Sequence, residues 1–268
     1  MALAVCATPI GNLDDVTLRV LEELRSADVI LCEDTRHTRV LLDRHGISGK
    51  LVSYHEHNEA KRAAEVLPRM EAGERFALVS DAGMPAISDP GARLVAAALE
   101  HGVAVTVLPG PTAVDTALVA SGFPAERYQF VGFLPRGARA RASLWEELAS
   151  WPYPVVAFES PRRLPATLRS LADAQPAREV AVCRELTKKF EEVVRGTAAE
   201  LAARFAEAPK GEITLVLGPG PGSPSADVGA AIEAVGELVS AGLPRRQAAD
   251  VVSRLTGASR NELYRRTL

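Results

Sequence analysis

Short apolar runs alternate with longer amphipathic runs along the first part of the chain. The short runs are typical of buried strands, and the amphipathic stretches repeat their apolar positions at helical spacing. Strands are predicted at residues 3–8, 29–32, 51–52, 76–80 and 103–108. Because this is a β-α-β-α order, we expect an α/β domain whose sheet is largely parallel, with helices on both faces. Right-handed crossovers then place the loops that follow the strands at one edge of that sheet.

The same alternation resumes after a stretch rich in proline and glycine at residues 122–124. Strands are predicted at residues 155–158, 179–184, 192–195 and 211–217, with a helix over 164–171. A further helix is predicted to begin at Thr197, because Thr197 and Glu200 have the spacing of a capping box. These elements predict a second α/β domain over residues 121–217, following a first domain over residues 1–120.

Residues 218–225 are all glycine, proline or serine, which is the composition of a linker. Beyond it, over residues 226–268, the pattern becomes wholly helical. Helices are predicted over 227–239 and 245–255, followed by a third in which Ser259 and Glu262 form a capping box. The short glycine-containing turn before the third helix resembles that of a helix-turn-helix unit. A plain helical hairpin fits the same pattern.

Composition excludes several classes of protein. The chain has 268 residues, of which 47% are hydrophobic, and a formal net charge of −3, which is typical of a folded globular protein. No apolar run reaches the ~18 residues that a membrane span needs, and the first residues lack the basic region of a signal peptide. The three cysteines are scattered and suit a reducing compartment. We therefore expect a cytoplasmic protein with no membrane partner.

Net charge is unevenly distributed along the chain. Residues 241–268 contain six arginines and two acidic residues, a net charge of +4, which leaves −7 for the remainder. A basic segment on an acidic body points to a polyanionic partner. The alternative is that these arginines simply form a solvated helical face.

Three loops rich in glycine and proline, at residues 8–12, 80–91 and 108–113, follow predicted strands and precede predicted helices. We expect all three at the same edge of the sheet, where small residues let a ligand approach the backbone closely. Helices that begin at Gly91 and Thr112 would present free N–H groups to an anionic part of that ligand. Glycine and proline also turn a chain without any ligand, but three such loops at one edge favour a binding site.

The sequence lacks the motifs of several common nucleotide and metal sites. The loop after the first predicted strand contains only Gly11, so the G-x-G-x-x-G pattern of dinucleotide-binding proteins is absent. The Walker A pattern of nucleoside triphosphatases is absent as well. His55 and His57 have no third ligand at a convincing spacing, so no metal site is predicted.

Charged residues cluster after the second predicted strand. Glu33 and Asp34 are followed by Arg36 and Arg39, and two arginines three residues apart on a helix share a face that can hold phosphate groups. Asp34 has a simpler interpretation as the cap of the helix that follows. A second cluster of mixed charge, over residues 184–191, ends a strand of the second domain and could face the charged cluster of the first domain. Its simpler interpretation is a set of surface ion pairs.

Several segments together resemble one family. They are Ala7–Leu13, Cys32–Arg36, Ser80–Gly91, Pro109–Ala113, Phe158–Pro161, Cys183–Lys188 and Gly211–Val216. These segments resemble the tetrapyrrole methylase superfamily, and in particular those members that methylate ribosomal RNA of the small subunit. The C-terminal helices resemble the small helical domain of those members, so the resemblance covers essentially the whole chain.

The resemblance implies two α/β domains with S-adenosylmethionine bound in the cleft between them, a small C-terminal helical domain, and a homodimer. It implies that the cofactor is contacted by Pro9, Asp81, Ala82, Gly83, Ile87, Thr112, Ala113 and Phe158. Asp81 stands where the superfamily has the acid of its Gly-Asp-Pro loop, although Ser80 replaces the glycine and further residues precede the next proline. The implied substrate is a decoding-centre cytidine of 16S ribosomal RNA in the small ribosomal subunit, methylated on its ribose 2′ oxygen.

The chemistry of that reaction assigns roles to the charged clusters. The methyl group of a sulfonium is already activated, so the protein mainly orients the reactants. A ribose hydroxyl is a competent nucleophile only when it loses its proton, and we expect Glu33 or Asp34 to accept that proton. The basic C-terminal segment would add salt-dependent affinity for RNA. Phosphate groups of the RNA are expected to contact Arg36, Arg39, Arg184 and Lys188.

Two alternatives stay open at this point. The first is a C-methyltransferase that acts on a corrinoid or porphyrin precursor, because a fold does not determine its substrate. The second is a helix-turn-helix regulator without enzymatic activity, whose α/β body senses a ligand. The charged segment at residues 33–36 and the basic C-terminal segment favour RNA over both alternatives.

Overall fold

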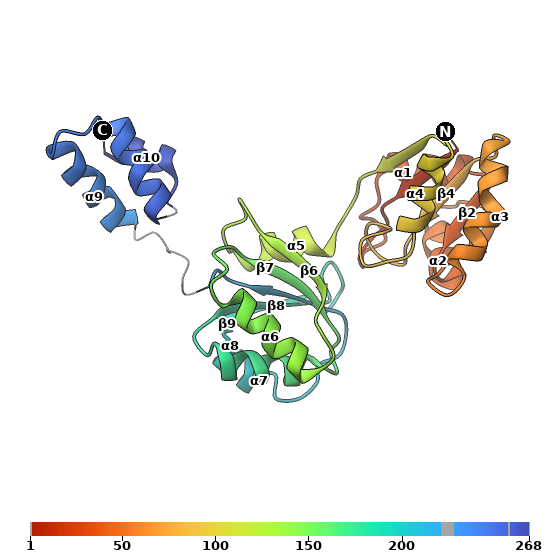
Figure 1. Cartoon of the computed structure of the whole chain (residues 1–268). Coiled ribbons are helices and arrows are strands. Elements are labelled where there is room, and N and C mark those ends of the chain that lie inside the picture. Colours follow the sequence, from red (N-terminus) through yellow and green to blue (C-terminus); the bar gives the residue numbers. More distant parts are fainter. Residues whose placement is uncertain (1, 221–227, 257, 268) are drawn as a thin grey trace. The chain divides into compact units, whose positions relative to one another are not determined.

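The computed structural model describes residues 2–220, 228–256 and 258–267. The chain forms two compact units (Figure 1): residues 1–120 with 183–192, and residues 121–182 with 193–268. Most of the predicted linker, the predicted helix start at Asp227 and the turn residue Gly257 lie outside the described residues. In the described part of the chain, no helix has both the length and the apolar character needed to cross a membrane.

The first unit contains a five-stranded sheet with the order β3-β2-β4-β1-β5, and every pair in it is parallel, as predicted. Its strands are β1 (Leu3–Cys6), β2 (Val29–Cys32), β3 (Leu51–Ser53), β4 (Phe76–Val79) and β5 (Val105–Leu108). All residues of β1, β2 and β4 are buried, as expected for parallel strands that are covered on both faces. Cys6 is in register with Val79 and Leu108, so the loops after β1, β4 and β5 begin at the same edge.

Helices cover both faces of this sheet because alternate strand residues point to opposite faces. Ala4 and Cys6 pack with α1 and α2, whereas Leu3 and Val5 pack with α3 and α4. One helix follows each strand in turn, and the bounds are α1 (Leu18–Ser26), α2 (Thr35–Arg44), α3 (Glu59–Glu71), α4 (Ala92–Glu100) and α5 (Ala113–Ser121).

The second unit is built on a mixed sheet with the order β6-β7-β10-β8-β9, in which β6 is parallel and β10 antiparallel to β7. Its strands are β6 (Gln129–Phe133), β7 (Val155–Glu159), β8 (Glu179–Arg184), β9 (Glu192–Thr197) and β10 (Ile213–Leu217). Trp145, Leu168 and Leu201 contribute to the apolar core that the strands share with α6 (Ala138–Ala149), α7 (Leu164–Ala174) and α8 (Ala198–Arg204). The predicted capping box of Thr197 and Glu200 is confirmed at the start of α8.

The C-terminal region consists of α9 (Val228–Ser240), α10 (Arg245–Thr256) and α11 (Arg260–Arg266). Small apolar residues such as Ala231, Ala248 and Ala249 let the three helices pack around Val235 and Leu263. The predicted helical character is therefore confirmed. The predicted capping box is not, because the Ser259 side chain makes no capping hydrogen bond to any backbone group that the structure describes.

Candidate active site

The three predicted loops lie at the carboxyl edge of the first unit's sheet, and two of them are joined by hydrogen bonds. The Thr8 amide donates to the Gly83 carbonyl at 2.8 Å, and the Gly83 amide donates to the Thr8 carbonyl at 3.1 Å. The Thr8 hydroxyl donates to the Ser80 carbonyl at 3.0 Å. The third loop lies close as well, since a Cβ atom at Gly110 would lie 2.8 Å from that of Ala7. The predicted gathering of the loops at one edge is thus confirmed.

The loop from Ser80 to Gly91 has a strained backbone. Ala86 and Ser88 have positive φ angles of 68° and 62°, a conformation that is costly for residues other than glycine. Gly91 has a φ of 135°, and a Cβ atom there would lie 2.8 Å from the Leu78 side chain. Strain of this kind persists only where the surrounding structure enforces it, and it concentrates in ligand-binding segments. The loop is therefore the leading candidate for a binding element.

Three carboxyl groups gather at this edge. Desolvation raises the pKa of Glu33, and the nearby charge of Asp81 raises it further. Desolvation also raises the pKa of Asp89 to about 6, with additional contributions from the charges of Glu33 and Asp81. In the described part of the chain, none of the three forms an ion pair with lysine or arginine. A cationic ligand group would relieve the repulsion among them.

Asp34 is the N-cap of α2, so the simpler of its two interpretations is confirmed. Its carboxylate accepts from the Arg36 amide at 2.8 Å and from the Arg36 guanidinium at 3.1 and 2.7 Å. These bonds hold the pKa of Asp34 well below its usual range, which makes Asp34 a weaker proton acceptor than Glu33. The Asp34 amide donates to Asp81 at 3.1 Å, so the cap also orients Asp81. Arg39 is exposed one turn further along α2.

The other predicted cofactor residues of the first unit lie in the same three loops. They are Pro9, Ala82, Gly83, Ile87, Thr112 and Ala113. Ile87 is an apolar side chain that is half exposed, at 50%, and it stands between the two strained residues of its loop. The Thr112 hydroxyl accepts from the Asp115 amide at 3.0 Å at the start of α5, so its side chain stabilises the helix end.

Phe158, the remaining predicted cofactor residue, lies in β7 of the second unit. Its ring meets those of Phe130 and Phe133 edge to face, with centroids 5.0 and 5.4 Å apart. The next residue, Glu159, has a fully buried carboxylate that pairs with Arg163 at 2.7 Å. Glu159 therefore fixes the turn that follows Phe158.

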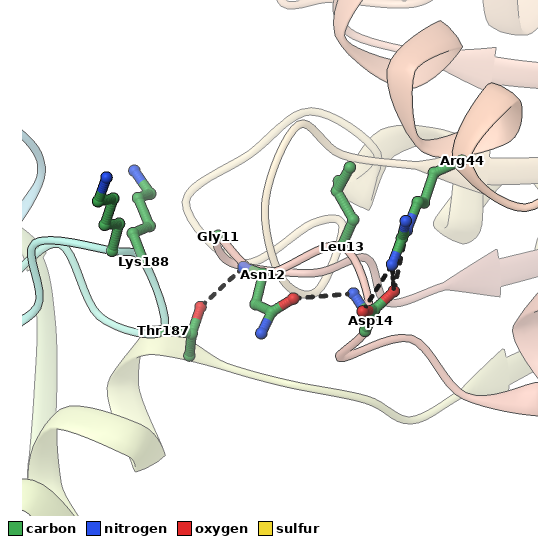
Figure 2. A pocket seen from close by; sticks show the side chains of 8 residues that line it. Gly11, Asn12, Leu13, Asp14, Arg44, Thr187 and Lys188 are labelled. Carbon is green, nitrogen blue, oxygen red and sulfur yellow. Dashed lines mark hydrogen bonds and ion pairs between the residues drawn. The ribbon is translucent and has the colours of Figure 1, made fainter.

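A hollow of about 440 Å³ opens beside the first loop (Figure 2). We call it the basic hollow, and it is lined by Gly11, Asn12, Leu13, Asp14, Arg44, Thr187, Lys188 and Lys189, all of which belong to the first unit. The Asn12 amide donates to the Thr187 hydroxyl at 3.0 Å, and Arg44 forms a bidentate ion pair with Asp14. The first loop therefore borders both the carboxyl edge and this hollow.

The predicted surface ion pairs in residues 184–191 are present in part. The Lys188 ammonium pairs with Glu185 at 3.0 Å, and Arg184 pairs with Glu192 at 3.1 Å. Of the two predicted phosphate ligands in this cluster, Lys188 lines the basic hollow, whereas Arg184 is not among its lining residues.

Sequence reasoning missed the individual roles of Asp89 and Arg44. The sequence did contain a signal for Asp89, because this residue lies just before Pro90 in the Ser80–Gly91 loop, which was predicted to bind a ligand. Arg44 had no such signal, because it is distant in the sequence from the 184–191 cluster, and only the tertiary fold brings it into the same hollow as Lys188 and Lys189.

Solved structures of methyltransferases share this fold. A uroporphyrin-III-C-methyltransferase from Thermus thermophilus matches with a TM-score of 0.59 at 21% identity, covering 81% of this chain and 94% of that one. The cobalamin biosynthetic enzyme cobalt precorrin-4 methyltransferase matches with a TM-score of 0.60 at 20% identity, with the same coverage of 81% and 94%. The fold is that of the tetrapyrrole methylase class.

Sequence comparison narrows this class. The family described as Tetrapyrrole (Corrin/Porphyrin) Methylases matches residues 2–202, and the RsmI C-terminal HTH domain matches residues 226–268. Ribosomal RNA small subunit methyltransferase I of Mesorhizobium japonicum is 45% identical over 270 residues, covering 100% of this chain and 91% of that relative. Its counterpart in Thermotoga maritima is 46% identical over 216 residues, covering 80% and 97%. The chain belongs to the ribosomal RNA small subunit methyltransferase I group of the tetrapyrrole methylase family.

Proposed function

We propose that this protein methylates 16S ribosomal RNA of the small ribosomal subunit, using S-adenosylmethionine as the methyl donor. We further propose that the acceptor is the ribose 2′ oxygen of a decoding-centre cytidine, cytidine 1402. The proposal rests on the match to relatives named ribosomal RNA small subunit methyltransferase I, which extends along the whole chain. This match includes the C-terminal helices, which the tetrapyrrole methylase family match does not cover. The homodimer stays a prediction.

The carboxyl edge of the first unit fits S-adenosylmethionine. The molecule carries a sulfonium and an ammonium group, and the edge presents the carboxyl groups of Glu33, Asp81 and Asp89. Gly83, with a φ of 80°, is the glycine whose backbone pairs with the first loop, and a residue without a side chain at this position lets a ligand approach the backbone closely. When bound, the cofactor supplies a methyl group that is already activated for in-line displacement.

Glu33 is the residue best suited to accept the proton of the ribose hydroxyl. A general base works best when its pKa approaches the working pH, and desolvation raises the pKa of Glu33 toward that range. Asp34 is committed to its cap and to Arg36, which lowers its pKa and its basicity. We therefore assign the proton transfer to Glu33 and the orientation of Asp81 to the Asp34 cap.

Arg36 and Arg39 are placed to hold RNA near this edge. The Arg36 side chain is 90% exposed and is paired with the partly exposed carboxylate of Asp34, and exposed pairs of this kind contribute little free energy. A phosphate group can therefore take over part of the guanidinium's hydrogen bonding. Arg39, exposed on the same helix, would contact a neighbouring phosphate.

The test is methyl transfer from labelled S-adenosylmethionine with three acceptors. The purified protein is incubated with small ribosomal subunits that lack the modification, with naked 16S ribosomal RNA, and with a porphyrinogen. We expect label in the ribosomal RNA and none in the porphyrinogen. Label in the porphyrinogen alone would replace the proposal with tetrapyrrole C-methylation, and no label in any acceptor would reject both.

A further inference from the structure

We propose that the basic hollow binds a single-stranded segment of the RNA substrate next to the nucleotide that is methylated. Its cations would hold a phosphate group, and the exposed ring of Phe190 would stack on a base. The inference rests on the proposed function, because it assigns the hollow to the same RNA.

The lining of the hollow is suited to an anion. Arg44, Lys188 and Lys189 contribute three cations to the lining, against the single lining carboxylate of Asp14, and the Lys188 ammonium is also paired with Glu185 at 3.0 Å. Arg44 and Asp14 are about half exposed, at 54% and 60%, so their ion pair is weak enough to be shared with a phosphate oxygen. Lys189 forms no ion pair with any carboxylate in the described ranges. Excess positive charge in a concave site attracts phosphate.

One wall of the hollow is the turn at residues 185–188, and its backbone has an energetically unfavourable conformation. Glu185 and Thr187 have positive φ angles of 52° and 64°, which are unfavourable for residues other than glycine. The first loop locks this turn, because the Asn12 amide donates to the Thr187 hydroxyl and Gly11 lies against Lys188. A Cβ atom at Gly11 would lie 2.5 Å from Lys188 Cγ. Structures retain such strain at binding sites.

The loop that locks the turn also reaches the proposed active site. Thr8 is hydrogen-bonded to the Ser80–Gly91 loop, and Asn12, four residues later, is bonded to the wall of the hollow. In Figure 2, Lys188 and Arg44 lie on either side of the loop at residues 11–14. An RNA strand held in the hollow is thus adjacent to the loop that borders the carboxyl edge.

Phe190 provides the second half of a site for single-stranded RNA. Its side chain is 65% exposed, although the chain has few aromatic residues, 5% in all. The Lys189 ammonium lies 5.7 Å from the centroid of the Phe190 ring. An exposed ring beside cations is the arrangement with which proteins bind single-stranded nucleic acid, because each base can stack while its phosphate is neutralised.

The test measures binding of the full-length protein to naked 16S ribosomal RNA over a range of salt concentrations. For Lys188→Gln and Lys189→Gln, we expect the slope of log affinity against log salt to fall by about 0.7 per lysine. For Phe190→Leu, we expect affinity to fall about tenfold with the slope unchanged, because stacking is not ionic. Lys61→Gln is the matched control, since Lys61 is an 84% exposed lysine of α3.

Kinetics separate this inference from the proposed function. The lysine variants should raise the KM for small ribosomal subunits and leave the KM for S-adenosylmethionine unchanged. If the unaltered protein methylates 16S ribosomal RNA but the lysine variants behave like Lys61→Gln, the hollow is not an RNA site. If Phe190→Leu changes the oligomeric state and not the RNA affinity, the ring contacts another copy of the chain and the stacking is wrong. If the unaltered protein methylates no ribosomal RNA, the proposed function itself fails.

Discussion

The first unit presents two regions of opposite charge that share one loop. At the carboxyl edge, desolvation raises the pKa of Glu33 and of Asp89, and the charge of the neighbouring Asp81 adds to both shifts. The lining of the basic hollow carries three cations and one carboxylate, and one of those cations, Lys188, is also paired with Glu185. A cationic cofactor and an anionic RNA need opposite electrostatic surroundings, and one compact unit supplies both. The formal net charge of −3 describes the chain as a whole. It therefore does not reveal that two regions of opposite charge would bind different molecules.

The largest expected effect is at the carboxyl edge. Glu33→Gln should lower the single-turnover rate of methyl transfer by about 10²- to 10⁴-fold, because the amide cannot accept the proton. In the unaltered protein the rate should fall as the pH is lowered through the pKa of Glu33, which lies above the usual glutamate value. Asp34→Asn is the matched control, because asparagine keeps a capping side chain. Its single-turnover rate should fall far less than that of Glu33→Gln. Similar rates for Glu33→Gln and the unaltered protein would rule out this base.

The next effect concerns the strained loop. Gly91→Ala should weaken S-adenosylmethionine binding, measured by calorimetry, and destabilise the fold by about 1–3 kcal/mol, because the new Cβ atom would meet Leu78. Gly73→Ala shares the positive φ, at 94°, but has open space around it. This control should lower stability by about 1 kcal/mol and leave the cofactor affinity unchanged. Equal loss of affinity in both variants would show that the loop has no specific role.

A smaller effect is the pH dependence of cofactor binding. The pKa of Asp89 is raised to about 6, and a bound cation would lower it, so binding should release a proton. Affinity for S-adenosylmethionine should therefore rise as the pH increases from about 5 to about 7, by up to roughly tenfold. Asp89→Asn should flatten this profile. S-adenosylhomocysteine, which lacks the sulfonium charge, should show a weaker pH dependence, and an identical profile for both compounds would contradict the electrostatic account.

The smallest effect is expected in the C-terminal helices. Arg246 and Arg265 are exposed on α10 and α11, and replacing both with glutamine should lower the salt slope of RNA binding by about 0.7 each. Arg19→Gln, at an exposed position of α1, is the control. An unchanged slope in the double variant would favour the interpretation of these arginines as a solvated helical face.

Local pattern was enough to predict the first sheet and its loops. Residues 3–6 and 29–32 are short, wholly apolar runs, and parallel strands align their loops at one edge without further information. The pattern did not predict β6, whose residues are only partly buried, with Phe133 61% exposed. The mixed charges of residues 184–191 suggested that this cluster could face the first domain, but the pattern assigned residues 183–192 to the second domain, whereas they pack with the first unit. Contacts between distant segments leave no local periodicity that would have shown this. For the same reason, Lys188 could be proposed as a phosphate ligand but not placed with Arg44 and Asn12.

The nature of the methylated atom tests the central claim most directly. After transfer of labelled methyl groups to small ribosomal subunits, the 16S ribosomal RNA is hydrolysed completely with alkali. Alkali cleaves next to a free 2′ hydroxyl and spares a 2′-O-methylated position. We predict that the label remains in one alkali-resistant dinucleotide that contains cytidine. Label in a mononucleotide would show that a base is methylated, and unlabelled RNA would show that ribosomal RNA is not the substrate, so either result would contradict the proposed reaction.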